Sequence, residues 1–316
     1  MNPLGIIGHA QILEQLSQLE GRHAFLLAGV PRLGKHKLAH WLTARVNCSS
    51  TSEKPCGICP SCTALLREAH PDLLEVGPKL ETGSGKAARR AARRAIIPIK
   101  AIAASRDDGH DFDVHVLEWL SIGPHYRRKV VVIDGAEFLN AEAANALLKV
   151  VEEPPNNALF IFLTRDLLEV IPTIVSRCTR LNIPPVSEGK MDAALTLLEG
   201  TEDPELLAFA AGRPGVLLER DAARAALSDA HTLLEGLESG MLEALSAADA
   251  LEKKFDPLWH PEALGFVARH FDSRVRLKLD EALLDAQERL EQYANAGLVF
   301  GVLALEWRRV LGYSGG

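Results

Sequence analysis

Residues 23–36 read HAFLLAGVPRLGKH, an apolar run followed by a glycine-rich turn and the start of a helical segment. The run from His23 to Ala28 has the length and composition of a buried strand. The turn from Gly29 to His36 matches the pattern GxxxxGK[ST] except at its last position. Between a strand and a helix, such a turn surrounds phosphate with backbone N–H groups while its lysine, here Lys35, bridges the terminal phosphates. This stretch therefore predicts a P-loop fold.

The last position of the turn departs from the pattern. His36 stands where a serine or threonine hydroxyl normally binds Mg²⁺, and a neutral imidazole is a poor ligand for this hard ion. Gly29, Gly34 and Lys35 are kept, and they permit weak anion binding. Whether ATP binds at all is therefore left open by these residues.

A second part of the expected nucleotide site is also altered. The strand Lys129 to Asp134 is apolar and ends in a carboxylate, as a Walker B strand does, but Gly135 follows where hydrolysing enzymes carry a glutamate. Loss of a general base costs about 10²–10⁴ in rate. Glu137 lies three residues further on and is expected to point elsewhere. The pattern predicts a degenerate site with no ATP hydrolysis of its own.

Further strands are predicted at residues 72–76, 158–163 and 179–183, and a helix is expected from Leu38 onward. Asn140 is the expected N-cap of a helix that ends near Glu152. Strands that alternate with helices predict an α/β parallel sheet covered on both faces. After residue 184 only helical patterns remain. We therefore expect a nucleotide-binding-like domain over 1–183, a small helical domain over 184–224 and an all-helical domain over 225–316.

Four of the five cysteines lie close together, with the spacing C-x₇-C-x₂-C-x₂-C. Four thiolates at such spacing match a closed, tetrahedral, structural Zn²⁺ site, here within an inserted module over residues 48–62. The fifth, Cys178, is expected to be a small buried residue. The predicted ligands are Cys48, Cys56, Cys59 and Cys62.

The overall charge limits the kind of partner. The net charge is −7, whereas a protein that binds DNA with its whole surface is usually basic. Any DNA contact is therefore expected to be local or to be made by partner proteins. The segment 79–100 is an exception because it carries Lys86, Arg89, Arg90, Arg93 and Arg94. It fits either a contact with DNA or an acidic partner, or a solvated insertion. No apolar stretch is long enough to cross a bilayer and no signal-peptide pattern is present, so we expect a cytoplasmic protein.

Several short motifs together resemble the bacterial clamp-loader family of AAA+ proteins. NALLK at 145–149 followed by EEPP at 152–155 is similar to a signature of that family, and SRC at 176–178 is similar to a second one. HAFL at 23–26 and HPD at 70–72 resemble two others, and all four occur in the family's order over roughly residues 5–183. The resemblance implies an AAA+ P-loop sheet, a helical lid over 184–224 and a helical collar that joins subunits over 225–316.

Within this family, the altered site resembles the delta-prime type rather than the gamma/tau motor type. The resemblance places Thr164 at the sensor 1 position and puts Gly215 where a sensor 2 arginine would stand, with Arg213 out of register. It also implies that Arg177 of SRC acts in trans as an arginine finger at a neighbour's ATP. From the residues alone, a local ion pair with a carboxylate is the alternative role for Arg177.

The resemblance implies a non-hydrolysing subunit of the DNA polymerase III clamp loader. Its partners would be the gamma/tau and delta subunits, and it would reach the sliding clamp and primed DNA through the complex. Two alternatives remain at this point. One is an ATP-hydrolysing motor subunit of the gamma/tau type, and the other is a zinc-dependent DNA-binding protein outside any loader.

Overall fold

The computed structural model describes residues 4–19, 21–78, 96–103, 114–292 and 294–313. The arginine-rich part of the segment predicted as basic lies outside these residues. The described chain divides into two compact units. The first is drawn from residues 1–79, 95–202 and 211–215, and the second from 203–210 and 216–316. The three-part division expected from the sequence stays a prediction.

The first unit contains a five-stranded, all-parallel sheet with the strand order β2-β3-β4-β1-β5. All five strands predicted from the sequence are present, with ends that differ by one residue from the prediction. They are β1 (Ala24–Ala28), β2 (Leu73–Val76), β3 (Val130–Asp134), β4 (Leu159–Thr164) and β5 (Thr179–Asn182).

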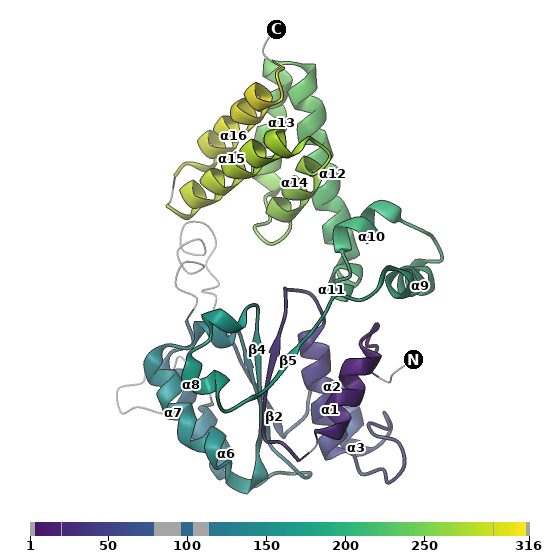
Figure 1. The fold of residues 1–316 in the computed structure, drawn as a ribbon, viewed down its shortest axis with the longest axis vertical. Helices are drawn as coiled ribbons and strands as arrows, with labels where there is room; N and C mark the ends of the chain where they lie inside the picture. Colours follow the sequence, from purple (N-terminus) through teal and green to yellow (C-terminus); the bar gives the residue numbers. More distant parts are fainter. Residues whose placement is uncertain (1–3, 20, 79–95, 104–113, 293, 314–316) are drawn as a thin grey trace. The chain divides into compact units, whose positions relative to one another are not determined.

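Helices cover both faces of this sheet, as the alternating pattern predicted (Figure 1). Along β3, Val130 and Val132 pack into the core beneath α1 and α2, whereas Val131 and Ile133 pack into the core beneath α5–α8. Successive side chains of a strand point to opposite faces, so each central strand contributes to both cores. The helices of this unit are α1 (Ala10–Gln18), α2 (Lys35–Asn47), α3 (Pro60–Leu66), α5 (Ile99–Ile102), α6 (Val116–Ser121), α7 (Ala141–Glu152), α8 (Pro172–Val175) and α9 (Glu188–Glu199).

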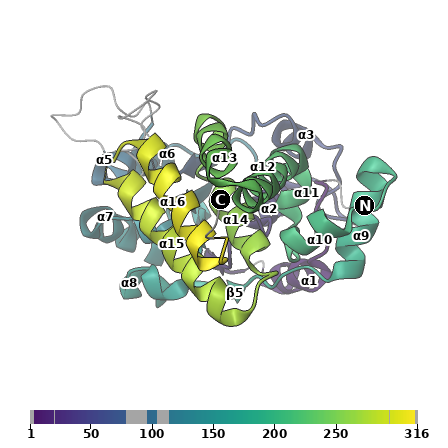
Figure 2. The same ribbon diagram turned by 90° about the horizontal axis from the view of Figure 1, so that it is seen from above.

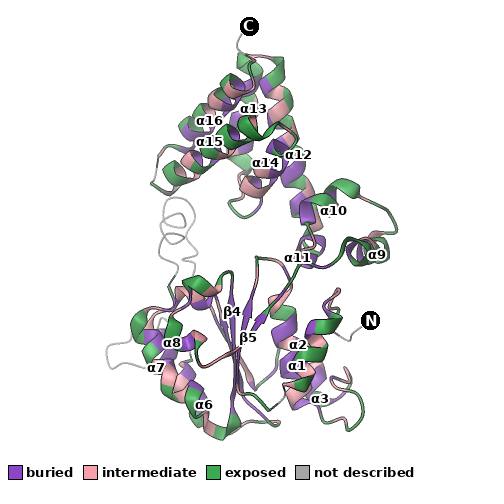
Figure 3. Ribbon diagram, viewed as in Figure 1, coloured by how far each residue is buried: buried purple, intermediate pink, exposed green. Residues whose placement is uncertain are grey.

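Helix α7 begins and ends where the sequence predicted. Asn140 caps it, since the Asn140 side chain accepts a hydrogen bond of 2.8 Å from the Ala143 N–H. Leu147 and Val151 are buried, whereas Asn145 and Lys149 are exposed. Burial is confined to one face of the helix, as Figure 3 shows for the helices around the sheet, so the other face of α7 is free to contact a partner.

The second unit consists of helices among the described residues, as expected for this part of the chain. Trp307 is fully buried in this unit and donates a hydrogen bond of 3.1 Å from Nε1 to the Leu279 carbonyl. Its last two helices lie side by side in both views (Figure 2). Its helices are α10 (Pro204–Ala210), α12 (Arg220–Ser239), α13 (Met241–Lys254), α14 (His260–Ala268), α15 (Ser273–Glu291) and α16 (Ala296–Val310), and α11 (Pro214–Leu218) crosses from the first unit into the second.

None of the helices in the described part of the chain is both long enough and apolar enough to span a bilayer.

Candidate functional site

The glycine-rich turn joins β1 to α2, as predicted, but the helix begins three residues earlier than expected. Gly34 lies at its N-cap with φ 86°, and Lys35 is its first residue. The Lys35 ammonium donates hydrogen bonds to the carbonyls of Gly29 and Val30, the second at 3.0 Å. Burial lowers the pKa of Lys35, while the nearby carboxylates of Glu137 and Asp134 act in the opposite direction. The lysine thus lies inside its own loop, where it satisfies loop carbonyls.

His36 lies between two carboxylates. Its Nε2 is 3.0 Å from Asp134 Oδ2, at the end of β3, and its Nδ1 is 3.6 Å from Glu75 Oε1, on β2. Hydrogen bonds to Asp134 and then to Glu75 raise the pKa of His36 to about 9. The same contact with His36, followed by one with His40, lowers the pKa of Glu75 to about 2. The imidazole therefore contacts the carboxylate that holds Mg²⁺ in hydrolysing relatives of the fold.

Glu137 differs from expectation. We predicted that it points away from the strand end, yet its side chain is only 5% exposed and its charge acts on Lys35. Its Oε1 accepts a hydrogen bond of 3.2 Å from Arg165 Nε, and its Oε2 is buried without a partner. The reason is the short 3₁₀ turn Ala136–Phe138, which folds the chain back after β3. The Glu137 carboxylate therefore lies close enough to Lys35 for its charge to act on the ammonium group.

Gly135, at the position of the missing catalytic glutamate, is required by the backbone. Its φ is 79°, and a Cβ there would lie 2.4 Å from the Phe138 ring. A side chain at this position would be strained in conformation and would overlap the ring. Restoring a glutamate here would therefore disturb the turn as well as change the chemistry.

Thr164, the expected sensor 1 residue, is buried at the end of β4. Its hydroxyl donates a hydrogen bond of 2.9 Å to the Asp166 carbonyl and accepts one of 3.2 Å from the Asp166 N–H. Its own carbonyl accepts a hydrogen bond of 3.2 Å from the Gly29 N–H. The hydroxyl thus serves the local turn, and the backbone of Thr164 anchors the start of the phosphate loop.

Gly215, at the expected sensor 2 position, packs directly against the phosphate loop. Its N–H donates a hydrogen bond of 2.8 Å to the Arg32 carbonyl. A Cβ at Gly215 would lie 2.9 Å from that carbonyl oxygen, closer than real Cβ contacts. The sequence showed only that an arginine is missing, whereas the structure shows that the loop approaches too closely for any side chain.

Arg177 of SRC lies just after α8, and its side chain is 32% exposed. Its guanidinium pairs with Glu152 at the end of α7 and donates a hydrogen bond of 2.9 Å to the Thr173 carbonyl. The local carboxylate considered from the sequence is therefore present. Cys178 beside it is only half-buried, and burial raises its pKa to about 12.

The four predicted cysteine ligands come together at the far end of α2. Cys48 follows the helix, Cys56 lies in the intervening loop, and Cys59 and Cys62 lie at the start of α3. Their sulfur atoms are all within 4.8 Å of one another, and those of Cys48 and Cys59 are 4.0 Å apart. Tetrahedral Zn–S bonds place sulfur atoms about 3.8 Å apart. The cluster can therefore hold a metal ion.

The HPD motif braces this cluster, a role that the sequence did not reveal. His70 is buried, with Nε2 3.0 Å from the Ser61 hydroxyl of α3 and Nδ1 accepting from the Asp72 N–H at 3.2 Å. The Asp72 carboxylate accepts hydrogen bonds from the backbone N–H groups of His125 and Tyr126, at 2.7 and 2.6 Å. These contacts connect the cysteine module, β2 and the chain before β3.

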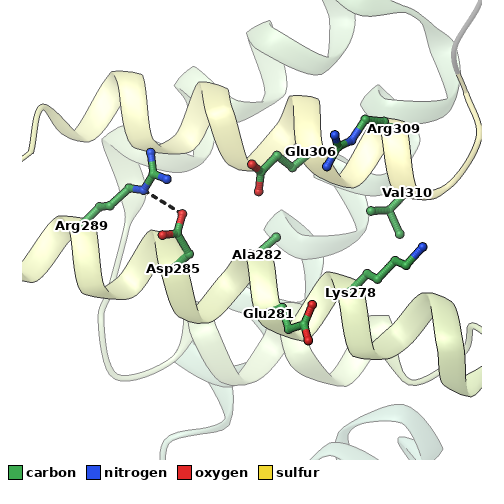
Figure 4. Close-up of a pocket in the computed structure, with 8 residues that line it drawn as sticks. All are labelled: Lys278, Glu281, Ala282, Asp285, Arg289, Glu306, Arg309 and Val310. Carbon is green, nitrogen blue, oxygen red and sulfur yellow. Dashed lines mark ion pairs between the residues drawn. The ribbon is translucent and has the colours of Figure 1, made fainter.

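A separate groove in the second unit shows no catalytic arrangement. It has a volume of 690 Å³ and lies between α15 and α16. Figure 4 shows that charges of both signs line it, with Arg289 paired to Asp285 at 2.7 Å. The other charged side chains that line it are Lys278, Glu281, Glu306 and Arg309.

The parallel sheet, the glycine-rich turn into α2 and the carboxylate at the end of β3 define the chain's first unit as a P-loop domain of the AAA+ class. A family model described as DNA polymerase III, delta subunit, matches residues 9–187, and the chain belongs to this family. The family resemblance stated from the sequence motifs is thereby confirmed.

Named relatives agree with this assignment. The chain is 31% identical over 212 residues to the DNA polymerase III subunit delta′ of Haemophilus influenzae, a match that covers 66% of this chain and 58% of that protein. It is 29% identical to the subunit delta′ of Pseudomonas aeruginosa, covering 75% of this chain and 68% of that protein. It is 26% identical to the subunit tau of Escherichia coli, covering 97% of this chain and 41% of that protein.

A solved structure supports the fold. A gamma-subunit-related protein of DNA polymerase III from Thermotoga maritima superposes with a TM-score of 0.51 at 18% identity, covering 94% of this chain and 99% of that one.

Proposed function

We propose that this chain is a delta-prime-type subunit of the DNA polymerase III clamp loader that supports assembly without hydrolysing ATP. The supporting observation is the phosphate loop, in which Lys35 bonds loop carbonyls and His36 contacts the Asp134 carboxylate. Gly135 stands in place of the catalytic glutamate, and the nearby carboxylate of Glu137 accepts a hydrogen bond from Arg165. The same residues argue against the ATP-hydrolysing motor alternative.

In this proposal, Arg177 serves the ATP site of a neighbouring motor subunit. Arginine suits the role because its planar, permanently charged group binds two phosphate oxygens at once. Here Glu152 and the Thr173 carbonyl hold the guanidinium in a partly exposed position. To act in trans, Arg177 would exchange the Glu152 carboxylate for the phosphate of the neighbour, so the ion pair would orient the side chain before assembly.

The expected partners are gamma/tau and delta subunits, with the sliding clamp and primed DNA reached through the complex. The second unit offers surface for such contacts. Leu277 and Leu284 of α15 are 60% and 61% exposed, and Leu298 of α16 is 71% exposed. Positions seven apart share a helix face, so the two leucines of α15 form a stripe that a neighbouring subunit would cover.

We further propose that the four-cysteine cluster holds structural Zn²⁺. Thiolates in a closed tetrahedral set favour this ion, and four protein thiolates would fill all four positions around it, with three of the cysteines buried.

The test is reconstitution with gamma/tau and delta subunits. Arg177→Ala should leave assembly intact but lower ATP turnover at the neighbouring site by about 10³-fold, the usual size of an arginine-finger effect. Turnover and clamp loading on primed DNA would be measured beside Arg180→Ala, an exposed arginine on β5 three residues away. Equal activity of the two variants would contradict the role of Arg177, and failure of the wild-type chain to assemble would contradict the proposed function.

A further inference from the structure

The start of α2 carries two histidines on the same face. His36 and His40 are four residues apart, and residues at this spacing are neighbours on a helix surface. Glu75 of β2 lies opposite both, with its Oε1 2.9 Å from His40 Nε2 and 3.6 Å from His36 Nδ1. Two imidazole nitrogens and one carboxylate oxygen from separate elements therefore converge on one point, with all donor atoms within 4.8 Å of one another.

These separations fit metal coordination. Bonds of about 2.0–2.1 Å in a tetrahedral arrangement place donor atoms about 3.3 Å apart, and the two distances to Glu75 Oε1 bracket this value. A bound ion would replace the proton between His40 and Glu75, and the two distances to Glu75 Oε1 would change by only a few tenths of an ångström, while the two imidazole nitrogens lie within 4.8 Å of each other.

Asp134 supplies the support that metal-binding histidines usually have. With His36 Nδ1 directed at the common point, the opposite ring nitrogen, Nε2, lies 3.0 Å from Asp134 Oδ2. A carboxylate that accepts a hydrogen bond from the second nitrogen fixes the tautomer and the orientation of a ligating imidazole. The retained Walker B carboxylate thus fits an orienting role toward His36.

We propose that His36, His40 and Glu75 bind a divalent transition-metal ion such as Zn²⁺, with Asp134 orienting His36. Imidazole and carboxylate donors suit this class of ion, whereas Mg²⁺ prefers an all-oxygen site. The side chains of His36, His40 and Glu75 are 50%, 24% and 42% exposed, so water can fill the fourth position. The site is separate from the four cysteines at the other end of α2, and it does not depend on the clamp-loader role.

The test is the number of metal ions that the full chain binds. After dialysis against Zn²⁺ at a buffered free concentration, the wild type should retain one more equivalent than His36→Gln or His40→Gln, measured by elemental analysis. Substitution with Co²⁺ separates the two sites, because thiolate ligands give an intense charge-transfer band that the nitrogen and oxygen site lacks. The variants should keep this band while they lose the extra equivalent.

His231→Gln is the matched control, since His231 is also a partly exposed histidine paired with a glutamate, Glu205, but belongs to no group of three possible metal ligands among the described residues. It should bind as much metal as the wild type. An equal number of equivalents in the wild type and in both α2 variants would overturn the proposal. Circular dichroism would verify that each variant is folded, and Glu75→Gln gives an independent removal of one ligand from a strand.

Discussion

The two ends of α2 carry different kinds of site. At its first residues the phosphate loop has lost the hydroxyl ligand, and Lys35 and His36 bind groups of the chain itself. Just past its last residue, Cys48 joins three other thiols in a complete four-sulfur set. The comparison teaches that a helix and its flanking turns can persist after the chemistry at one end has changed, because the core between α2 and the sheet holds the helix in place.

The largest effect is expected at the cysteine end. Cys62→Ser should abolish metal binding at the cysteine cluster and lower the free energy of unfolding by about 3 kcal/mol or more, because binding energy at a structural metal site contributes directly to folding. Denaturant unfolding with and without a chelator would measure this. Cys178→Ser, outside the cluster, is the control and should change stability by about 1 kcal/mol or less.

At the phosphate-loop end, effects should come from the backbone. Gly215→Ala and Gly135→Ala should each lower stability by about 1–3 kcal/mol, the first through overlap with the Arg32 backbone and the second through strain at positive φ. Gly189→Ala in α9 is the control, since a Cβ there meets nothing within 4 Å. Unfolding midpoints equal to that of the control would show that the loop is not closely packed.

A buried histidine contacts the chain near each end of α2. The contributions of these two histidines to stability can be compared through the pH dependence of unfolding. His9 Nε2 donates to the Leu33 carbonyl of the phosphate loop at 2.8 Å, as His70 contacts Ser61 of the cysteine module. Burial lowers the pKa of both histidines. For His9, the hydrogen bond to Leu33 opposes this shift and Lys190 adds to it, and for His70, Asp72 opposes it while His125 adds to it.

Below about pH 6.5 these two histidines bind protons in the unfolded chain but stay neutral in the folded chain. The free energy of unfolding should therefore fall as the pH falls. The slope is at most about 1.4 kcal/mol per pH unit for each histidine. His9→Asn and His70→Asn should each flatten the slope between pH 7.5 and 5.5, measured by urea unfolding. A slope unchanged in both variants would show that other groups govern the acid sensitivity.

The smallest effect is expected from repairing the loop. His36→Ser restores the missing hydroxyl, yet ATP turnover by the purified chain should stay at background because Gly135 still replaces the general base. A steady-state assay with Mg²⁺ and DNA would measure it. Turnover of about 1 s⁻¹, within the ordinary enzyme range, would favour the motor interpretation instead.

The sequence by itself determined the elements and the family. Strands such as VVVID at 130–134 are apolar and β-branched enough to form a strand in any buried setting, and Asn140 caps α7 through contacts three residues away. Short-range patterns of this kind need no knowledge of the fold. The motifs NALLK, EEPP and SRC were sufficient for the family assignment because they occur together and in order.

Only the tertiary structure decided how the altered residues are used. Glu75 and His36 are far apart in the chain. They meet because β2 ends, and α2 begins, at the same edge of a parallel sheet. The approach of Gly215 to Arg32 and the pairing of Arg177 with Glu152 have the same origin. Such contacts depend on packing between distant segments, and no local pattern of residues encodes them.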